Sequence, residues 1–146
     1  MKTDLQRELY KRHSSMLNQA RYDDINAAII RYGFQFGDGW FSIVDNYLTE
    51  IETLCDNYNN VKPLFLQIKE KFGHLRIYFD YTNNEELNEK LDAITEFYIN
   101  RSKTTCEACG VFAEIETIRN SKKCLCEECF QLFKHSSYST ADVLIN

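Results

Sequence analysis

The amino-acid sequence predicts an α+β fold in which helices pack on an antiparallel β-hairpin and a four-cysteine zinc-ribbon module follows at the C-terminal end. Three observations favour this fold. Apolar residues recur with helical spacing in four segments. Two adjacent segments in the middle of the chain alternate apolar and polar residues, as strands do. Two Cys-x-x-Cys pairs then lie sixteen residues apart, a spacing typical of zinc sites.

The N-terminal third is expected to be helical. The spacing predicts a helix over residues 3–18, begun by a capping box of Thr3 and Gln6, and a second helix over 24–32. The glycine-rich stretch GFQFGDGW that follows predicts a loop. Asp38 within it is expected to cap the next helix.

The clearest helix is predicted over residues 40–58, where Trp40 opens a regular apolar stripe that includes Cys55. Cys55 is therefore expected in the core. A further helix is predicted over 84–101, with Asn83 as its N-cap and Glu86 completing a variant capping box.

Between these two helices the apolar period changes to two. Strands are predicted over residues 62–69 and 74–81, joined by the turn sequence EKFG into a β-hairpin. Leu64, Leu66 and Ile68 are expected to form the apolar face of the first strand. The helices on either side are the natural cover for that face. We expect one domain over 1–103, the zinc-ribbon module over 104–130 and a polar tail over 131–146.

The metal-ligand candidates are Cys106, Cys109, Cys126 and Cys129. Two cysteines separated by two residues on a tight turn can both face one tetrahedral centre, and Gly110 supplies the permissive backbone that such a turn needs. The β-rich stretch between the pairs can bring them together. We expect one structural Zn²⁺, because four thiolates leave no position open for water. A disulfide or redox pair and an iron–sulfur cluster are the alternatives, and the spacing does not match the ferredoxin patterns.

The remaining cysteine and histidine residues are expected to lie outside the metal site. Cys124 is interpreted as a strand residue or a small buried hydrophobe, with a role as ligand as the alternative. His135 could replace a cysteine but is six residues beyond Cys129. His13 and His74 are expected at the surface.

The hairpin carries basic residues interleaved with aromatic ones, and these residues define a possible partner or nucleic-acid surface. They are Lys69, Lys71, His74, Arg76 and Tyr78. Phosphate contacts and base stacking would use this combination. A solvated strand face, with charges that discourage edge-to-edge pairing, is the simpler interpretation. The net charge of −5 and the sequence pI of 5.2 lack the basic footprint of a general nucleic-acid-binding protein.

Asp38, Asp45, Glu50 and Glu52 could form an acid–base pair, but they are expected to be solvated on a cap and a polar helix face. No nucleophile–histidine–acid pattern and no phosphate-binding glycine loop is recognisable, so we do not expect an enzyme. The charged N-terminus lacks the apolar region of a signal peptide, and no apolar run is long enough for a membrane span. A cytoplasmic protein is therefore expected.

Four stretches together resemble a family of small, poorly characterised bacterial and phage proteins: FGDGW (36–40), QIKEKFGHLRIYF (67–79), CEACG (106–110) and CLCEEC (124–129). The resemblance covers about residues 33–130. It implies the fold, the zinc site and an origin in a phage or mobile element, and no activity is attached to the family. A Thr-Leu-Cys often precedes the last pair there, which implies that the first cysteine of CLCEEC is not a ligand.

These observations predict a non-enzymatic zinc-binding protein that acts by binding a host protein. It would serve as an adaptor or as an inhibitor, for example of a defence system such as CRISPR or restriction. The alternative is a nucleic-acid-binding module that uses the 69–78 hairpin and the zinc ribbon.

Overall fold

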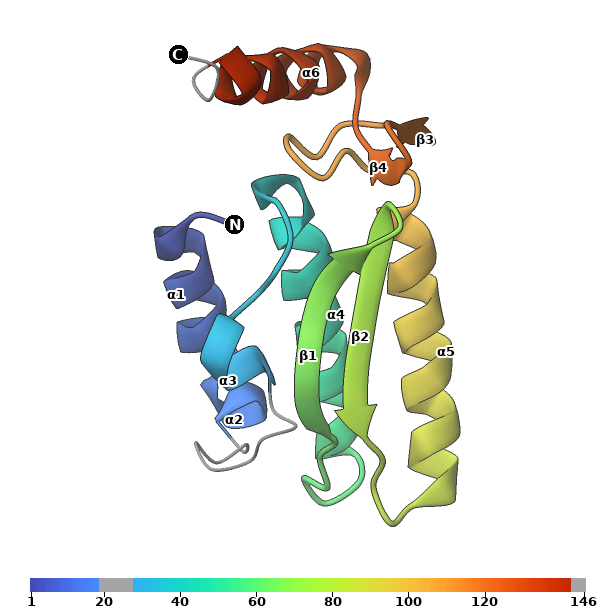
Figure 1. Ribbon diagram of the computed structural model, residues 1–146. Coiled ribbons are helices and arrows are strands. Elements are labelled where there is room, and N and C mark those ends of the chain that lie inside the picture. The colour runs from blue at the N-terminus through green and yellow to red at the C-terminus, as the bar shows by residue number, and fades with distance from the viewer. Residues whose placement is uncertain (19–27, 143–146) are drawn as a thin grey trace.

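The computed structural model describes residues 1–18 and 28–142 and shows a mixed α+β fold, as predicted (Figure 1). The segment 24–27 of the helix expected over 24–32 lies outside the described residues. The elements in chain order are α1 (Thr3–Arg12), α2 (Ser14–Leu17), α3 (Ala28–Tyr32), η1 (Asp38–Trp40), α4 (Phe41–Asp56), β1 (Leu64–Lys71), β2 (His74–Asp80), α5 (Glu85–Ser102), β3 (Ile115–Ile118), β4 (Ser121–Cys124) and α6 (Glu127–Asp142). The polar tail expected from residue 131 is thus helical through Asp142.

The core lies between the β1–β2 hairpin and the two long helices α4 and α5. Figure 1 shows α4 behind the hairpin, α5 along its β2 side and the N-terminal helices on its β1 side. Phe65 and Ile68 of β1 and Leu75 of β2 are buried here together with Tyr47 of α4. The Tyr47 hydroxyl also bonds Thr95 Oγ1 of α5 at 2.9 Å, which links the two helices inside the core.

The hairpin differs from the predicted alternation because β1 contains a bulge between Phe65 and Gln67. The extra residue shifts the register, so Phe65 and Ile68 are buried while Leu66 is only half-buried. The expected apolar face of Leu64, Leu66 and Ile68 is therefore wrong.

The β1–β2 turn consists of Phe72 and Gly73, whose φ angles are 58° and 81°. Two positive φ values are the signature of a type I′ turn, whose twist matches that of a hairpin. Glycine adopts this backbone freely. For Phe72 the left-handed conformation costs about 1–2 kcal/mol.

Three predicted helix caps are wrong. Thr3 does not begin a capping box: Lys2 is the N-cap of α1, and the Gln6 side chain bonds Met1 O at 3.1 Å instead of the cap. Asp38 does not cap the following helix: its Oδ1 accepts a hydrogen bond from the backbone N–H of Lys2 at 2.8 Å. This hydrogen bond lowers the pKa of the Asp38 carboxyl.

At the start of α5 the cap is Asn84, not Asn83. Its Oδ1 accepts the N–H of Leu87 at 2.9 Å, so the capping interaction that the sequence predicts is present one residue later than expected.

The helix expected over 3–18 is interrupted at His13, which is only 2% exposed and not a surface residue. Its Nε2 lies 2.8 Å from Asp45 Oδ1 and its Nδ1 lies 3.1 Å from Glu52 Oε2, both on α4. These two carboxylates are therefore not simply solvated. Both ring nitrogens are occupied, so we interpret His13 as a polar clamp between the N-terminal helices and α4.

His13→Ala should lower the free energy of unfolding by about 2 kcal/mol, because it leaves two half-buried carboxylates without their shared partner. Urea unfolding measures this change. His135→Ala, at an exposed position on α6, is the matched control and should change stability by less than about 0.5 kcal/mol. Equal effects of the two substitutions would contradict the clamp.

Candidate metal centre

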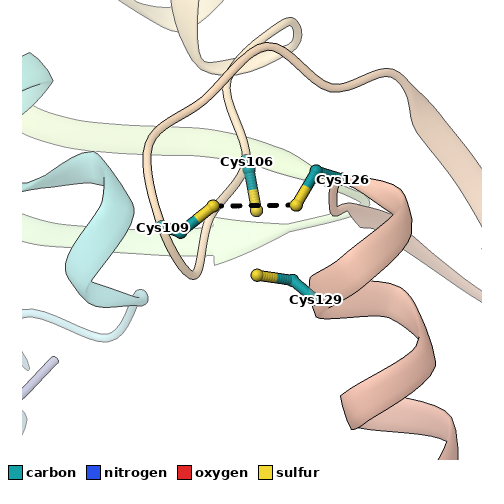
Figure 2. Close-up of side chains that lie close together, drawn as sticks. All are labelled: Cys106, Cys109, Cys126 and Cys129. Carbon is teal, nitrogen blue, oxygen red and sulfur yellow. Dashed lines mark hydrogen bonds between the residues drawn. The ribbon is translucent and has the colours of Figure 1, made fainter.

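The first cysteine pair is held by a tight turn. Gly110 has a φ of 85°, its N–H bonds Cys106 O at 2.9 Å, and the Cys106 N–H bonds Val111 O at 2.7 Å. This backbone turns the chain around Cys106 and Cys109 so that both side chains face the same side (Figure 2). The glycine predicted to permit the turn is therefore in the conformation that only glycine adopts without strain.

The second pair begins the C-terminal helix. Cys126 precedes α6 and Cys129 lies in its first turn, where the N–H of Phe130 bonds Cys126 O at 2.8 Å. The connector between the pairs forms the β3–β4 hairpin, as its β-rich sequence predicts. Its antiparallel strands bring the two pairs to the same point in space.

All four candidate ligands meet there. The Sγ atoms of Cys106, Cys109, Cys126 and Cys129 lie within 4.8 Å of one another, and no disulfide joins them. The Cys109 and Cys126 sulfurs are 3.6 Å apart (Figure 2). This group can hold a metal ion. Cys106 is buried, whereas Cys109 is exposed, so an ion can reach the site from solvent.

The protein environment favours the thiolate of Cys106 and resists that of Cys129. Burial opposes ionisation of Cys106, but hydrogen bonds from the backbone N–H groups of Cys126, Cys109 and Ala108 bring its pKa down to about 7. Burial and its sulfur neighbours raise the pKa of Cys129. The positive charge of a bound cation would stabilise the deprotonated sulfurs, so metal binding would displace the thiol protons.

Cys124 does not join the group. It lies on β4, is fully buried, and donates from Sγ to Lys103 O at 3.4 Å. Burial raises the pKa of this thiol to about 11, so it stays protonated. The interpretation of Cys124 as a small buried strand residue is confirmed, and Cys55 is buried in the core as expected. His135 is exposed on α6 and is not one of the clustered groups.

The GDGW loop packs against the first cysteine turn and forms hydrogen bonds with it. The N–H of Gly39 bonds Glu107 O at 2.8 Å, and the indole N–H of Trp40 bonds Thr105 O at 2.7 Å. A Cβ at Gly39 would lie only 2.2 Å from Cys106 O. The sequence predicts a loop here but gives no sign that the loop contacts the metal site.

The end of the β1–β2 hairpin is the second support. A Cβ at Gly73 would come within 2.8 Å of the Ile115 side chain on β3. Lys123 of β4 pairs with Glu70 at 2.7 Å and lies 3.7 Å from Glu107, whose pKa is raised by burial. The cysteine module therefore rests on both the GDGW loop and the hairpin. Its treatment as a separate module over 104–130 stays a prediction.

The predicted hairpin surface is brought together on the outer face of the sheet. Lys69 is paired with Arg76 and Lys71 with His74 across the strands, so these four side chains share one face with Tyr78. Lys69 Nζ lies 5.8 Å from the Tyr78 ring centroid. His74 is half-buried and its Nδ1 is 3.3 Å from Phe72 O.

The four carboxylates considered as an acid–base pair each have a structural partner. Asp38 is bonded to Lys2, and Asp45 and Glu52 contact His13. Glu50 accepts a hydrogen bond from the Tyr98 hydroxyl at 2.8 Å. Burial is the main reason that the pKa of Tyr98 is raised to about 12, and this hydrogen bond to Glu50 is the second. The four carboxylates do not converge on one point.

Comparison with known proteins gave no match to a protein family, a curated protein or a solved structure. Within the described residues, none of the helices combines the length and the apolar character needed to cross a bilayer. The metal centre must therefore be interpreted from its own geometry.

Gly39→Ala should weaken metal binding, because the added methyl group would displace the backbone of Cys106. We expect the affinity for Zn²⁺ to fall roughly tenfold in a chelator competition, equivalent to about 1.4 kcal/mol. Ile51→Val is the control: it removes a methylene from the core of α4 at a cost of about 1 kcal/mol without touching the loop. Equal metal affinities in both variants would show that the GDGW loop does not support the cysteine turn.

Proposed function

We propose that the four clustered cysteines bind one structural Zn²⁺ and that the protein is a non-enzymatic binding protein. Four sulfur ligands in a tetrahedral arrangement suit zinc, and they leave no coordination position for a substrate or an activated water. The single observation that carries this proposal is the approach of the four Sγ atoms to within 4.8 Å without a disulfide.

In this proposal the ion fixes the C-terminal module to the rest of the protein. The stretch from Thr104 to Phe130 has few large buried side chains: Ala113, Ile118 and two cysteines account for its buried apolar residues. Such a segment cannot stabilise itself by apolar burial alone, so the free energy of metal binding serves as folding free energy.

Cys109→Ser should release the zinc, whereas Cys124→Ser should retain it, because only Cys109 belongs to the sulfur cluster. Metal content after gel filtration measures the difference. Cys124→Ser should keep the local structure, because the serine hydroxyl can still donate to Lys103 O. Loss of zinc from the Cys124 variant alone would show that the ligand set is wrong.

The proposed binding surface is the apolar surface of the metal module. Phe112 and Val111, just after the first cysteine pair, are 72% and 53% exposed, and Leu132 on α6 is 71% exposed. In Figure 1, α6 lies across the end of the protein that carries the cysteine module. Large apolar side chains left exposed to solvent are candidates for protein–protein contacts. These residues therefore support a protein partner over a small-molecule substrate.

We propose that this partner is a host protein, in keeping with the resemblance to small phage and bacterial proteins. The protein would act in the cytoplasm as an adaptor or inhibitor, for example of a CRISPR or restriction system. A closed metal site suits such a role, because a rigid scaffold presents a surface without the entropy loss that a flexible segment suffers on binding.

Phe112→Glu should abolish capture of the partner from host lysate, because it places a charge in the apolar surface. Quantitative affinity capture compares this variant with Tyr32→Glu, which changes an aromatic residue that is 63% exposed on α3. We expect at least a roughly tenfold loss for the Phe112 variant alone. Equal retention by both variants, or no partner above background for the wild type, would argue against this surface.

A further inference from the structure

A basic pocket lies where the end of the β1–β2 hairpin meets the cysteine module. Its volume is about 500 Å³, within the range of ligand pockets. Strand β2, the end of α5 and the β3–β4 hairpin all contribute side chains to it. The lining residues are Phe72, His74, Arg76, Lys103, Ile115 and Lys122.

The cations of this pocket have no anionic partner among the ion pairs of the described residues. The nearby Glu70 is paired with Lys123 instead, and Lys103 Nζ bonds the neutral side chain of Asn100 at 2.7 Å. Arg76 Nε is buried and has no hydrogen-bond partner in the described part of the chain. A buried donor without a partner costs free energy, so the guanidinium of Arg76 keeps unused hydrogen-bonding capacity at the wall of the pocket.

The charge in the pocket also acts on His74. Burial lowers the pKa of this imidazole, and the positive charges of Arg76 and Lys103 lower it further. The site is thus cationic in a chain whose formal net charge is −5. Guanidinium and ammonium groups that converge on one concavity match the chemistry of a phosphate group.

Phe72 adds a second recognition element at the same place. The residue is 54% exposed at the edge of the pocket, and Lys71 Nζ lies 5.2 Å from the centroid of its ring. Its φ of 58° is a conformation that asparagine or glycine would adopt more easily. The turn requires this backbone, but it does not require a phenylalanine, so the aromatic side chain calls for another reason. An exposed aromatic ring beside cationic groups can stack on the base of a nucleotide.

We propose that this pocket binds single-stranded nucleic acid, with a phosphate held by Arg76, Lys103 and Lys122 and an unpaired base stacked on Phe72. Lys69 and Lys71 extend the positive charge along the outer face of the hairpin. A groove with basic and aromatic residues binds single strands because their bases are free to stack. This site is separate from the apolar surface around Phe112 and does not depend on it.

The test is fluorescence anisotropy with a labelled, mixed-sequence oligonucleotide of about 12 nucleotides at roughly 50 mM salt, where the electrostatic contribution is strongest. Arg76→Glu and Lys122→Glu should each weaken binding roughly tenfold or more. Lys11→Glu makes the same charge change at an exposed position on α1 and should change the affinity less than about twofold. Zinc content confirms that each variant is folded.

Phe72→Asn separates stacking from folding. An Asn-Gly pair is favoured in a type I′ turn, so the urea midpoint should stay equal or rise while oligonucleotide affinity falls about tenfold. A duplex of the same sequence should compete less well than the single strand. The proposal is overturned if the wild type does not bind at low salt, if Lys122→Glu or Phe72→Asn binds as tightly as the wild type, or if the duplex competes equally.

Discussion

The backbone of Gly39 packs directly against the first cysteine turn, and this contact ties the cysteine cluster to the rest of the fold. A side chain at this position would overlap the backbone of Cys106, which is one of the four clustered cysteines. The next residue, Trp40, is fully buried and leads directly into the core helix α4. Gly39 and Trp40 thus connect the cysteine cluster to the hydrophobic core. The packing of Trp40 in the core therefore depends on whether the cysteine cluster is ordered.

The same arrangement relates the metal to both proposed binding surfaces. The β3–β4 hairpin is positioned by the cysteines at its ends, and it supplies Ile115 and Lys122 to the basic pocket. The exposed Phe112 lies in the loop that follows the first cysteine pair. A structural ion would therefore shape surfaces with which it has no direct contact. Under the proposed function, a site without a catalytic role would in this way be essential to binding.

Periodicity and spacing predicted the α+β class, the approximate positions of the long helices and the hairpin, and the grouping of four cysteines apart from Cys124. These features follow from local rules: 3.6-residue and two-residue periods, and the reach of two Cys-x-x-Cys turns. The cap of α5 was misplaced by one residue, and the larger errors came from contacts between distant segments. His13 interrupts a regular helix to reach two carboxylates on α4. The bulge in β1 and the seating of the GDGW loop likewise depend on partners that are about 10 to 70 residues away along the chain.

If the cysteine cluster and the GDGW loop form one unit, the fluorescence of Trp40 should report metal binding without interference, because the chain contains 1 Trp. The indole is buried and bonds Thr105 O, next to the first ligand. Removing the metal with a chelator under native conditions should shift the emission to longer wavelength, and adding Zn²⁺ should restore it. Complete loss of the metal with an unchanged emission spectrum would contradict the account.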